Sequence, residues 1–397
     1  MRMHQTHLGI GWLRIAFLAL VALVPTSPRA AEEPSSQCGA PAAHTSDLPI
    51  GSPAGAGFDA PALCAAMKRG AEAPINLHSL LVSRGGHLVA EIYRTGPDKP
   101  MNAIFPRTTS FGPHIRHDMR SISKSVVGLL AGILAEEGKF PSLASPVLAQ
   151  CPELEPDADA AHRSITIAHL LTMSSGLEWR EAAGTYGTLG NDETHLFWTW
   201  SPVRYVMQKP MAAPPGTRFN YSGGDTAVIA DLLARGTGQT LPDIARTRLF
   251  APLGIVDWEW LGDLWGRPVP FAGLRLRPRD LLKIGMMLLG DGRWQGHQIV
   301  PAAWIEASFG LNMDTREGAP TRHYGYFWWT DELMQGGRSV RYAVAVGNGG
   351  QRLFLAPKLD LAVAMTAGAY NDPGIGRPEH DLFLAIVSAA AVPASTR

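Results

Sequence analysis

The spacing of apolar residues predicts strands near both ends of the chain and helices between them. Two apolar segments, residues 80–82 and 87–93, flank a turn that contains Gly85-Gly86 and predict a β-hairpin. Towards the C-terminus, segments rich in Val, Tyr, Phe and Trp predict further strands at 324–330, 340–346, 352–356 and 361–366. Glycine and proline residues between these segments mark their turns.

Helical periodicity fills the middle of the chain. After Ser121, apolar residues recur at helical spacing and stop at Gly138. A short helix with Asp59 as its N-cap is predicted over residues 59–69. Further helical patterns cover residues 167–173, 226–235, 279–289 and 380–391.

Strands from both ends of the sequence, with helices between them, predict an α+β fold. We expect an antiparallel sheet built from both termini, flanked by helices, with a mainly helical inserted subdomain. The folded domain is placed at residues 58–397, with 58–120 and 290–397 in the sheet part and 121–289 in the mainly helical part. A doubly wound parallel sheet is disfavoured, because it would alternate strand and helix throughout.

The first 31 residues have the pattern of a secretory signal peptide: Arg2 and Arg14, then an apolar run over 15–24, then small residues. An apolar run of about ten residues is shorter than the roughly 20 that span a bilayer as a helix. We therefore expect no stable membrane span after signal cleavage, and a secreted or periplasmic protein. Residues 32–57, rich in Ala, Pro, Ser and Gly, predict an extended leader.

Composition narrows the class of partner. Of 397 residues, 46% are hydrophobic, and 35 basic side chains balance 35 acidic ones, so we expect no nucleic-acid partner. Three cysteines leave the pairing open, with Cys38–Cys64 as one option. None has a ligand neighbour at zinc spacing, and we interpret His114 and His117 as structural or solvent-facing. The sequence thus predicts no metal and no cofactor.

The first chemical signal stands at the start of the helix that follows Arg120. Ser121 and Lys124 are three residues apart, so a helix places hydroxyl and amine on one face. A serine hydroxyl becomes a nucleophile when a neighbouring base takes its proton, and a lysine can do so if its pKa is lowered. The N-terminus of the helix also offers a positive field to a developing oxyanion.

Two later segments add to this signal. Tyr221 stands just before another helical pattern, where its phenol could transfer a proton to a leaving group. Near the C-terminus, Asn348, Gly349, Gly350 and Gln351 interrupt a run of strands. Glycines in a strand permit close approach of a ligand, and an amide at the strand edge can stabilise an oxyanion.

Together these segments resemble the serine β-lactamase and penicillin-binding-protein superfamily, on the branch of class C β-lactamases, related esterases and 6-aminohexanoate-dimer hydrolases. Ser121 to Lys124 matches the Ser-x-x-Lys motif, Tyr221 the start of the second motif, and 348–350 the third. The resemblance implies that Ser121 attacks a carbonyl, that Lys124 and Tyr221 share the acid and base roles, and that the backbone amides of Ser121 and Gln351 bind the oxyanion.

Two departures from the family pattern shape the expected activity. The second motif reads Tyr221-Ser222-Gly223 and lacks the Asn of lactamases, and the third has neutral Asn348 in place of a cationic residue. Both favour an esterase or amidase acting on a small molecule over a β-lactamase or D,D-peptidase, which remain the alternatives. A non-catalytic acyl-binding sensor on the same fold is a third interpretation.

An irregular stretch between the first two motifs borders the site in relatives of this kind, which makes Tyr186, Asn191 and Asp192 possible substrate-binding residues. Other chemistries find no support in the sequence. It contains no Gly-x-Ser-x-Gly elbow and no His-Glu-x-x-His zinc helix, and Gly138-Lys139 is followed by Phe140, which a phosphate-binding loop would replace with Ser or Thr.

Overall fold

The computed structural model describes residues 41, 48–181, 186–310, 312–315, 319 and 321–390, which belong to one compact unit of the chain. The predicted signal peptide and most of the leader lie outside the described residues. The folded part begins before the predicted boundary at residue 58, because Leu48 is buried in the core and Ile50 forms a parallel bridge with Leu88.

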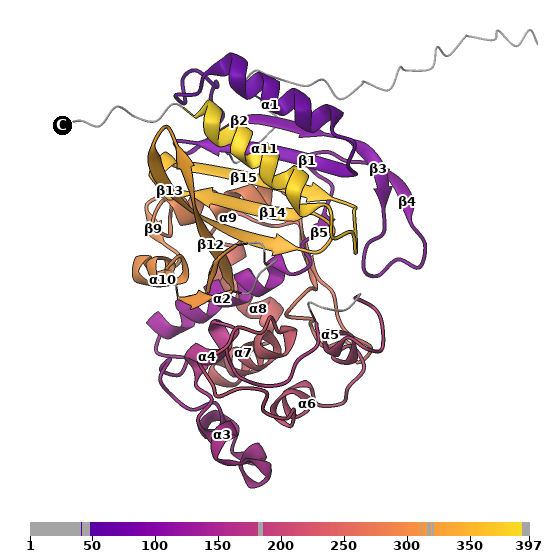
Figure 1. Ribbon diagram of the computed structural model, residues 1–397, viewed down its shortest axis with the longest axis vertical. Coiled ribbons are helices and arrows are strands. Elements are labelled where there is room, and N and C mark those ends of the chain that lie inside the picture. Colours follow the sequence, from indigo (N-terminus) through magenta and orange to yellow (C-terminus); the bar gives the residue numbers. More distant parts are fainter. Residues whose placement is uncertain are drawn as a thin grey trace, which may run out of the picture. The chain divides into compact units, whose positions relative to one another are not determined.

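A large antiparallel sheet forms the centre of the fold and takes strands from both ends of the chain, as the sequence predicts (Figure 1). Its strands, in spatial order, are β10 (Met313–Asp314), β11 (His323–Gly325), β12 (Trp328–Gln335), β13 (Arg338–Gly347), β14 (Gln351–Ala356), β15 (Leu361–Ala367), β1 (Leu77–Arg84) and β2 (His87–Tyr93). The N-terminal hairpin therefore joins the C-terminal meander through the pairing of β1 with β15.

Helices cover both faces of this sheet. On one face lie α1 (Ala60–Glu72), capped by Asp59 as predicted, and α11 (Gly376–Ala389), whose Phe383 stacks on Phe354 of β14 with 4.3 Å between ring centroids (Figure 1). On the other face lies α9 (Pro278–Leu289), in which Gly285 allows close contact with Leu353 of β14. Alternating side chains of β14 thus pack against different helices, which explains why this strand is buried throughout.

One predicted strand is in fact two. The segment 324–330 was expected to run straight, but a tight turn at Tyr326 and Phe327, with φ of 39° and 68°, separates β11 from β12. Phe327 is buried in the turn and accepts a hydrogen bond at its carbonyl from Ser125 Oγ, 2.6 Å away. Because both turn residues are aromatic and Phe327 is buried, the apolar pattern gives no sign of a break.

The middle of the chain is mainly helical, as predicted. Its longest helices are α2 (Ile122–Glu136) and α7 (Gly223–Thr237). The shorter helices of the chain are η1 (Leu148–Gln150), η2 (Pro152–Asp157), α3 (Ala160–Arg163), α4 (Ile167–Leu171), α5 (Asp192–His195), α6 (Pro202–Met207), α8 (Leu241–Ala245), η3 (Arg246–Phe250), α10 (Ala302–Ser308) and η4 (Pro357–Leu359).

In the described part of the chain, three small sheets accompany the large one, and one of them joins the sheet part to the helical part. They are the pair β3 (Thr95–Asp98) and β4 (Arg107–Ser110), the triplet β5 (His117–Asp118), β7 (Leu274–Leu276) and β6 (Trp258–Trp260), and the pair β8 (Arg293–Trp294) and β9 (His297–Gln298). The triplet anchors the segment just before Ser121 to the end of the helical region.

The described residues bear in part on two predictions, the cysteine pairing and the lack of a membrane-spanning helix. Cys64 is disulfide-bonded and Cys151 is a buried free thiol, whereas Cys38, the predicted partner of Cys64, lies outside the described residues. In the part of the chain that the structure describes, no helix has both the length and the apolar character required to cross a membrane.

Candidate active site

Ser121 occupies the N-cap position of α2, at a sharp bend of the chain. The preceding residue, Arg120, has a left-handed backbone with φ of 50°, a conformation that costs a non-glycine residue about 1 kcal/mol or more. Two contacts of the Arg120 guanidinium hold this bend. Arg120 Nε lies 3.3 Å from Asp118 Oδ2, and Arg120 Cζ lies 4.4 Å from the ring centroid of Tyr370. Strain of this kind, paid for by neighbouring contacts, is common where a fold presents a reactive side chain.

Lys124 brings its amine to the hydroxyl of Ser121, as the spacing of the first motif predicts. Its Nζ lies 3.1 Å from Ser121 Oγ, within hydrogen-bonding distance. The lysine side chain is almost fully buried, at 1% exposed, and its Nζ also donates to the carbonyl of Phe271 at 3.4 Å. The amine is therefore fixed in one position beneath the serine.

Two carboxylates that the sequence analysis did not identify complete the surroundings of this amine. Lys124 Nζ lies 2.8 Å from Glu193 Oε2 and 3.2 Å from Glu181 Oε1. Both glutamates are buried. The buried positive charge of Lys124 is thus balanced within hydrogen-bonding distance, as a charge in a low-dielectric interior requires.

The fold holds Glu181 by several donors at once. Its Oε2 accepts hydrogen bonds from the indole Nε1 of Trp179 at 2.8 Å and from the backbone N–H of Gly223, at the start of α7, at 2.5 Å. Asn191 ties the two carboxylate-bearing residues together, because its Nδ2 donates to Glu181 O and its Oδ1 accepts from Glu193 N. The stretch 177–195 has no apolar periodicity, and the residues predicted from it were Tyr186, Asn191 and Asp192 rather than the two glutamates.

The environment of Lys124 reverses one expectation. A lysine acting as a base was expected to have a lowered pKa, and burial does act in that direction. Glu181 and Glu193 outweigh the burial, so the pKa of Lys124 is raised and the amine carries its proton. The pKa of Glu193 is also raised well above its ordinary value, by burial first and then by the charge of Glu181. The amine of Lys124 is therefore charged at neutral pH, and both burial and the charge of Glu181 favour the protonated form of Glu193.

Tyr221 joins the same cluster from the N-terminal side of α7. Lys124 Nζ lies 4.8 Å from the centroid of the Tyr221 ring, so the three groups named in the sequence motifs do converge. The ring stacks on Trp329 of β12 at 5.4 Å between centroids and 28° between planes. Burial raises the pKa of Tyr221, against the opposing effects of Lys124 and of a hydrogen bond with Ser121, so the phenol keeps its proton at neutral pH.

The third motif forms the turn between β13 and β14. Gly349 and Gly350 have φ of 91° and 97°, which favours glycine, and a Cβ at Gly349 would clash with the Tyr370 ring. Asn348 is held by Asn371, with its Nδ2 2.9 Å from Asn371 Oδ1. The Gln351 side chain points back to the sheet, where its Nε2 donates to Ala367 O at 2.6 Å. Its side chain therefore supports the turn.

The three possible substrate-binding residues of the irregular stretch separate into two kinds. Tyr186 lines the clefts at Ser121, and its hydroxyl lies 3.4 Å from Glu181 Oε1. Asn191 and Asp192 are buried and do not line these clefts. Asp192 instead accepts from Lys209 Nζ at 2.5 Å. Their side chains hold the loop in place.

Two clefts open at Ser121. One, of about 640 Å³, extends between Ser121, Tyr221 and the third motif towards α11. It is lined by charged side chains of both signs, from Asp331, Asp372 and Arg377, and by His380. The other, of about 420 Å³, is lined by Phe197, Trp198, Met101, Arg120 and Tyr370. A molecule bound across Ser121 would thus meet a charged rim on one side and an aromatic wall on the other.

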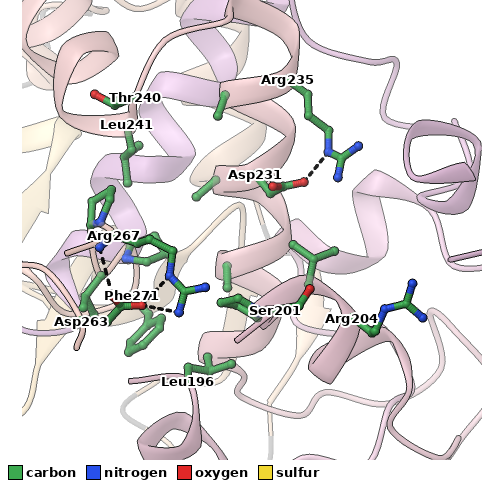
Figure 2. A pocket seen from close by; sticks show the side chains of 18 of the residues that line it. Leu196, Ser201, Arg204, Asp231, Arg235, Thr240, Leu241, Asp263, Arg267 and Phe271 are labelled. Atoms are coloured by element: carbon green, nitrogen blue, oxygen red, sulfur yellow. Dashed lines mark hydrogen bonds and ion pairs between the residues drawn. The ribbon is translucent and has the colours of Figure 1, made fainter. Parts of the chain in front are cut away.

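A larger cavity, of about 790 Å³, lies within the helical part (Figure 2). Its charged side chains pair with one another: Arg235 Nε lies 2.5 Å from Asp231 Oδ2, and Arg267 Nε donates to Asp263 Oδ2 at 2.7 Å. None of Ser121, Lys124 and Tyr221 lines this cavity. Size alone therefore does not mark the reactive site, which lies where nucleophile, amine and phenol meet.

The chain is similar in sequence to proteins of a known family. The sequence profile of the β-lactamase family matches residues 78–387. The chain is 28% identical over 312 residues to a 6-aminohexanoate-dimer hydrolase of Paenarthrobacter ureafaciens, covering 74% of this chain and 73% of that protein. It is 33% identical over 146 residues to esterase EstB of Burkholderia gladioli, covering 35% of this chain and 37% of that protein.

Among solved structures, a penicillin-binding protein homologue from Caulobacter crescentus superposes with a TM-score of 0.60 at 16% identity, covering 82% of this chain and 97% of that one. At that identity the likeness shows the fold alone. The fold and the buried Ser–Lys–Tyr cluster define a serine hydrolase with a β-lactamase or transpeptidase architecture. The chain belongs to the β-lactamase family.

Proposed function

We propose that this chain is exported and hydrolyses a small ester or amide through an acyl-enzyme formed on Ser121. The observation that carries the proposal is the 3.1 Å contact between Ser121 Oγ and a buried lysine amine that is itself held by two carboxylates. The named activities of the relatives, an amide-dimer hydrolase and an esterase, support the same class of reaction.

The charges in the cluster favour a proton relay over a simple lysine base. As Ser121 Oγ bonds to the substrate carbonyl carbon, the hydroxyl proton moves to Lys124 Nζ, and one Nζ proton moves to Glu181 at 3.2 Å. The carbonyl electron pair moves to oxygen, where the N-terminus of α2 stabilises it. Lys124 thus stays charged throughout.

Tyr221 completes the proton balance. When the tetrahedral intermediate collapses, the neutral phenol gives its proton to the leaving oxygen or nitrogen and becomes a phenolate beside Lys124. In the second half-reaction the phenolate takes a proton from the attacking water. Ser121 then leaves with a proton from Lys124, which recovers one from Glu181, and every group returns to its starting state.

The residues that line the cleft indicate which kinds of substrate it favours. The third motif supplies no cation, because Asn348 is neutral, but Arg377 and His380 line the same cleft together with Asp331 and Asp372. A rim with both signs of charge suits a linear amide or ester that ends in a carboxylate or an amine. This favours such substrates over β-lactams, which rely on a cation at the third motif in relatives.

Labelling with a fluorophosphonate probe tests the proposal. We expect one label per chain in the wild type, no label in Ser121→Ala, and full labelling in the matched control Ser164→Ala, an exposed serine. Turnover of p-nitrophenyl acetate should accompany the label. Labelling without turnover would support the sensor, and a folded protein with neither would overturn the acyl-enzyme.

A substrate panel separates the remaining alternatives. Matched pairs of esters and linear amides, with and without a terminal carboxylate, should differ in KM, and Arg377→Ala should remove that difference. Rapid hydrolysis of a chromogenic cephalosporin would instead favour a β-lactamase. Sequencing the N-terminus of protein recovered from outside the cytoplasm tests the predicted export, since processing near residue 31 is expected.

A further inference from the structure

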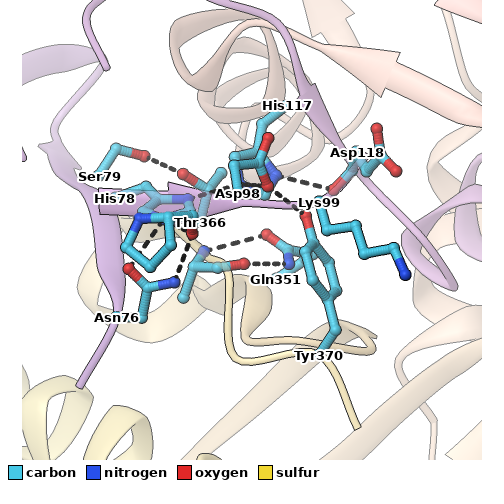
Figure 3. A network of polar contacts seen from close by, with 12 residues as sticks. Asn76, His78, Ser79, Asp98, Lys99, His117, Asp118, Gln351, Thr366 and Tyr370 are labelled. Carbon is cyan, nitrogen blue, oxygen red and sulfur yellow. Dashed lines mark hydrogen bonds and ion pairs between the residues drawn. The ribbon is translucent and has the colours of Figure 1, made fainter. Parts of the chain in front are cut away.

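A second cluster of ionisable side chains lies outside the Ser–Lys–Tyr site, among strands that the sequence separates widely (Figure 3). His78 of β1, Asp98 of β3 and His117 of β5 are all buried. One ligand atom from each lies within 4.8 Å of the other two. His117, which the sequence analysis interpreted together with exposed His114, is thus fully enclosed and has a histidine and an aspartate as neighbours.

The outer nitrogens of the two rings are His78 Nε2 and His117 Nδ1, and their contacts bear on where each ring carries its hydrogen. His78 Nε2 lies 3.1 Å from Asn76 Oδ1 and 3.2 Å from Pro97 O, and both atoms accept only. The orientation of the Asn76 amide is set because its Nδ2 donates to Pro97 O at 2.6 Å. His117 Nδ1 lies 3.0 Å from the carbonyl oxygen of Asp118. These contacts favour a hydrogen on each outer nitrogen.

The inner nitrogens are left with lone pairs that face each other. In neutral rings hydrogenated on the outside, His78 Nδ1 and His117 Nε2 are both acceptors, and they lie only 2.8 Å apart. Two buried lone pairs at this distance repel each other unless a positive charge lies between them. The carboxylate of Asp98, with Oδ1 3.9 Å from His117 Nε2, adds a negative charge on the same side.

All three side chains are enclosed, with His78 and His117 at 0% and Asp98 at 5% exposed. A metal ion bound between them is one source of that positive charge. Neutral imidazole is the form that binds metal ions. Phe111 stacks on His78 with 4.0 Å between ring centroids and closes one side of the cluster.

The partners of these side chains have the pattern of an outer shell around a metal. Metal-binding histidines usually donate their other N–H to a carbonyl or carboxylate, and ligating carboxylates accept a hydrogen bond from a neighbour. Here the outer nitrogens of both histidines lie within hydrogen-bonding distance of carbonyl oxygens, and Asp98 accepts from the hydroxyl of Tyr370 at 2.8 Å (Figure 3).

We propose that His78, Asp98 and His117 bind one divalent transition-metal ion, for which Zn²⁺ is the best match. Two imidazole nitrogens and one carboxylate oxygen are ligands that zinc prefers. At Zn–N distances of about 2.0–2.1 Å, tetrahedral geometry separates two nitrogens by about 3.3 Å, so the rings must open by roughly half an ångström from their 2.8 Å separation.

The ion would join β1, β3 and β5 at a point linked to the active site. Tyr370, bound to Asp98, lines a cleft at Ser121 and packs under the guanidinium of Arg120. A buried ion that links three strands stabilises structure. Its expected effect is to hold the bend that presents Ser121.

Metal content tests the proposal with the full-length protein. Protein purified without chelators should retain close to one Zn²⁺ per chain by inductively coupled plasma mass spectrometry. Chelated protein reloaded with Co²⁺ should show the visible absorption of a tetrahedral or five-coordinate site. His78→Gln and His117→Gln should lower the affinity for Zn²⁺ by about 10- to 100-fold or more. The control His297→Gln, at an exposed position of β9, should bind like the wild type.

Asp98→Asn provides a variant that keeps an acceptor for Tyr370 but removes the ligand charge. It should remain folded by near-ultraviolet circular dichroism and still lose Zn²⁺. Ser121→Ala should bind Zn²⁺ normally, which separates this site from the acyl-enzyme. The proposal is overturned if folded wild type neither retains Zn²⁺ nor gains thermal stability from it, or if the histidine variants bind as well as the wild type. A shared imidazole proton seen by ¹⁵N NMR in metal-free protein that ignores Zn²⁺ would overturn it too.

Discussion

Glu193 reaches Lys124 from 69 positions away in the sequence, and its Oε2 lies 2.8 Å from the lysine Nζ, closer than the serine hydroxyl at 3.1 Å. This contact and that of Glu181 decide the charge of the amine. The site therefore starts from a protonated lysine and a neutral phenol, and the serine proton must be passed onwards to a carboxylate.

The two glutamates should respond differently to the same substitution. Burial and the charge of Glu181 raise the pKa of Glu193. Glu193→Gln mimics the protonated form that this shift favours, and it should lower kcat/KM less than about tenfold. Glu181→Gln removes the anion that accepts the relayed proton and should cost about 100-fold or more. Steady-state kinetics of both variants from pH 5 to 9 measure this. Equal losses in the two variants would contradict the assignment of charge.

Ser121 and Lys124 should behave as one unit. Ser121→Ala and Lys124→Ala are each expected to reduce kcat by about 10³- to 10⁶-fold, and the double variant should be little worse than either, because cooperating groups are far from additive. Lys124→Ala also leaves Glu181 and Glu193 without their cation, so its folding is checked by circular dichroism. Near-native rates in folded Lys124→Ala would remove lysine from the mechanism.

Tyr221→Phe separates proton donation from packing. The ring still stacks on Trp329, so stability should change little, while the lost hydroxyl should lower amide hydrolysis by about 10²- to 10⁴-fold. Esters of p-nitrophenol should suffer less, because p-nitrophenolate leaves without a proton. The ratio of amide to activated-ester rates in the variant and the wild type measures the effect. An equal loss on both substrates would argue against a donor role.

The turn of the third motif should tolerate no side chain at Gly349. In Gly349→Ala the new Cβ would clash with the ring of Tyr370, which should displace Asn348 and lower kcat/KM by at least about tenfold. Gly337→Ala is the matched control: its φ is also positive, at 77°, but it has open space around it in the β12–β13 turn. Both variants pay a similar backbone cost, so a loss of activity confined to Gly349→Ala identifies the contact.

Glu379 should make stability depend on pH. Burial raises its pKa to about 7, against the effect of Arg352, from an ordinary value of 4.5. The folded state therefore binds this proton more tightly than the unfolded state. The stabilisation is complete below about pH 4.5 and is lost as pH rises to about 7, by about 1.4 kcal/mol per unit and roughly 3 kcal/mol in all.

Urea unfolding of wild type and Glu379→Gln at pH 5, 6 and 7.5 measures this contribution as a difference. Wild type should lose stability relative to the variant as pH rises through this window. A constant difference would show that Glu379 does not titrate there. Arg352 also donates to the carbonyls of Gly347 and Gln351, so the same titration is expected to alter the third-motif turn and, with it, activity.

The sequence by itself determined the elements whose cause is local. Residues three apart on a helix share a face, so the proximity of Ser121 and Lys124 follows from helical period alone. Alternating and continuous apolar segments likewise predicted the sheet and its flanking helices. The turn between β11 and β12 was not predicted, because its residues, Tyr326 and Phe327, are aromatic like the strand residues around them.

Only the tertiary structure decided how the site is charged. Glu181 and Glu193 belong to a stretch without periodicity, and nothing in their spacing indicates that they meet Lys124. The meeting of His78, Asp98 and His117 likewise depends on how β1, β3 and β5 are brought together. The pKa of a buried group reflects every charge within a few ångströms, irrespective of its distance along the chain. Whether Lys124 is a base or a charged relay is therefore a property of the fold.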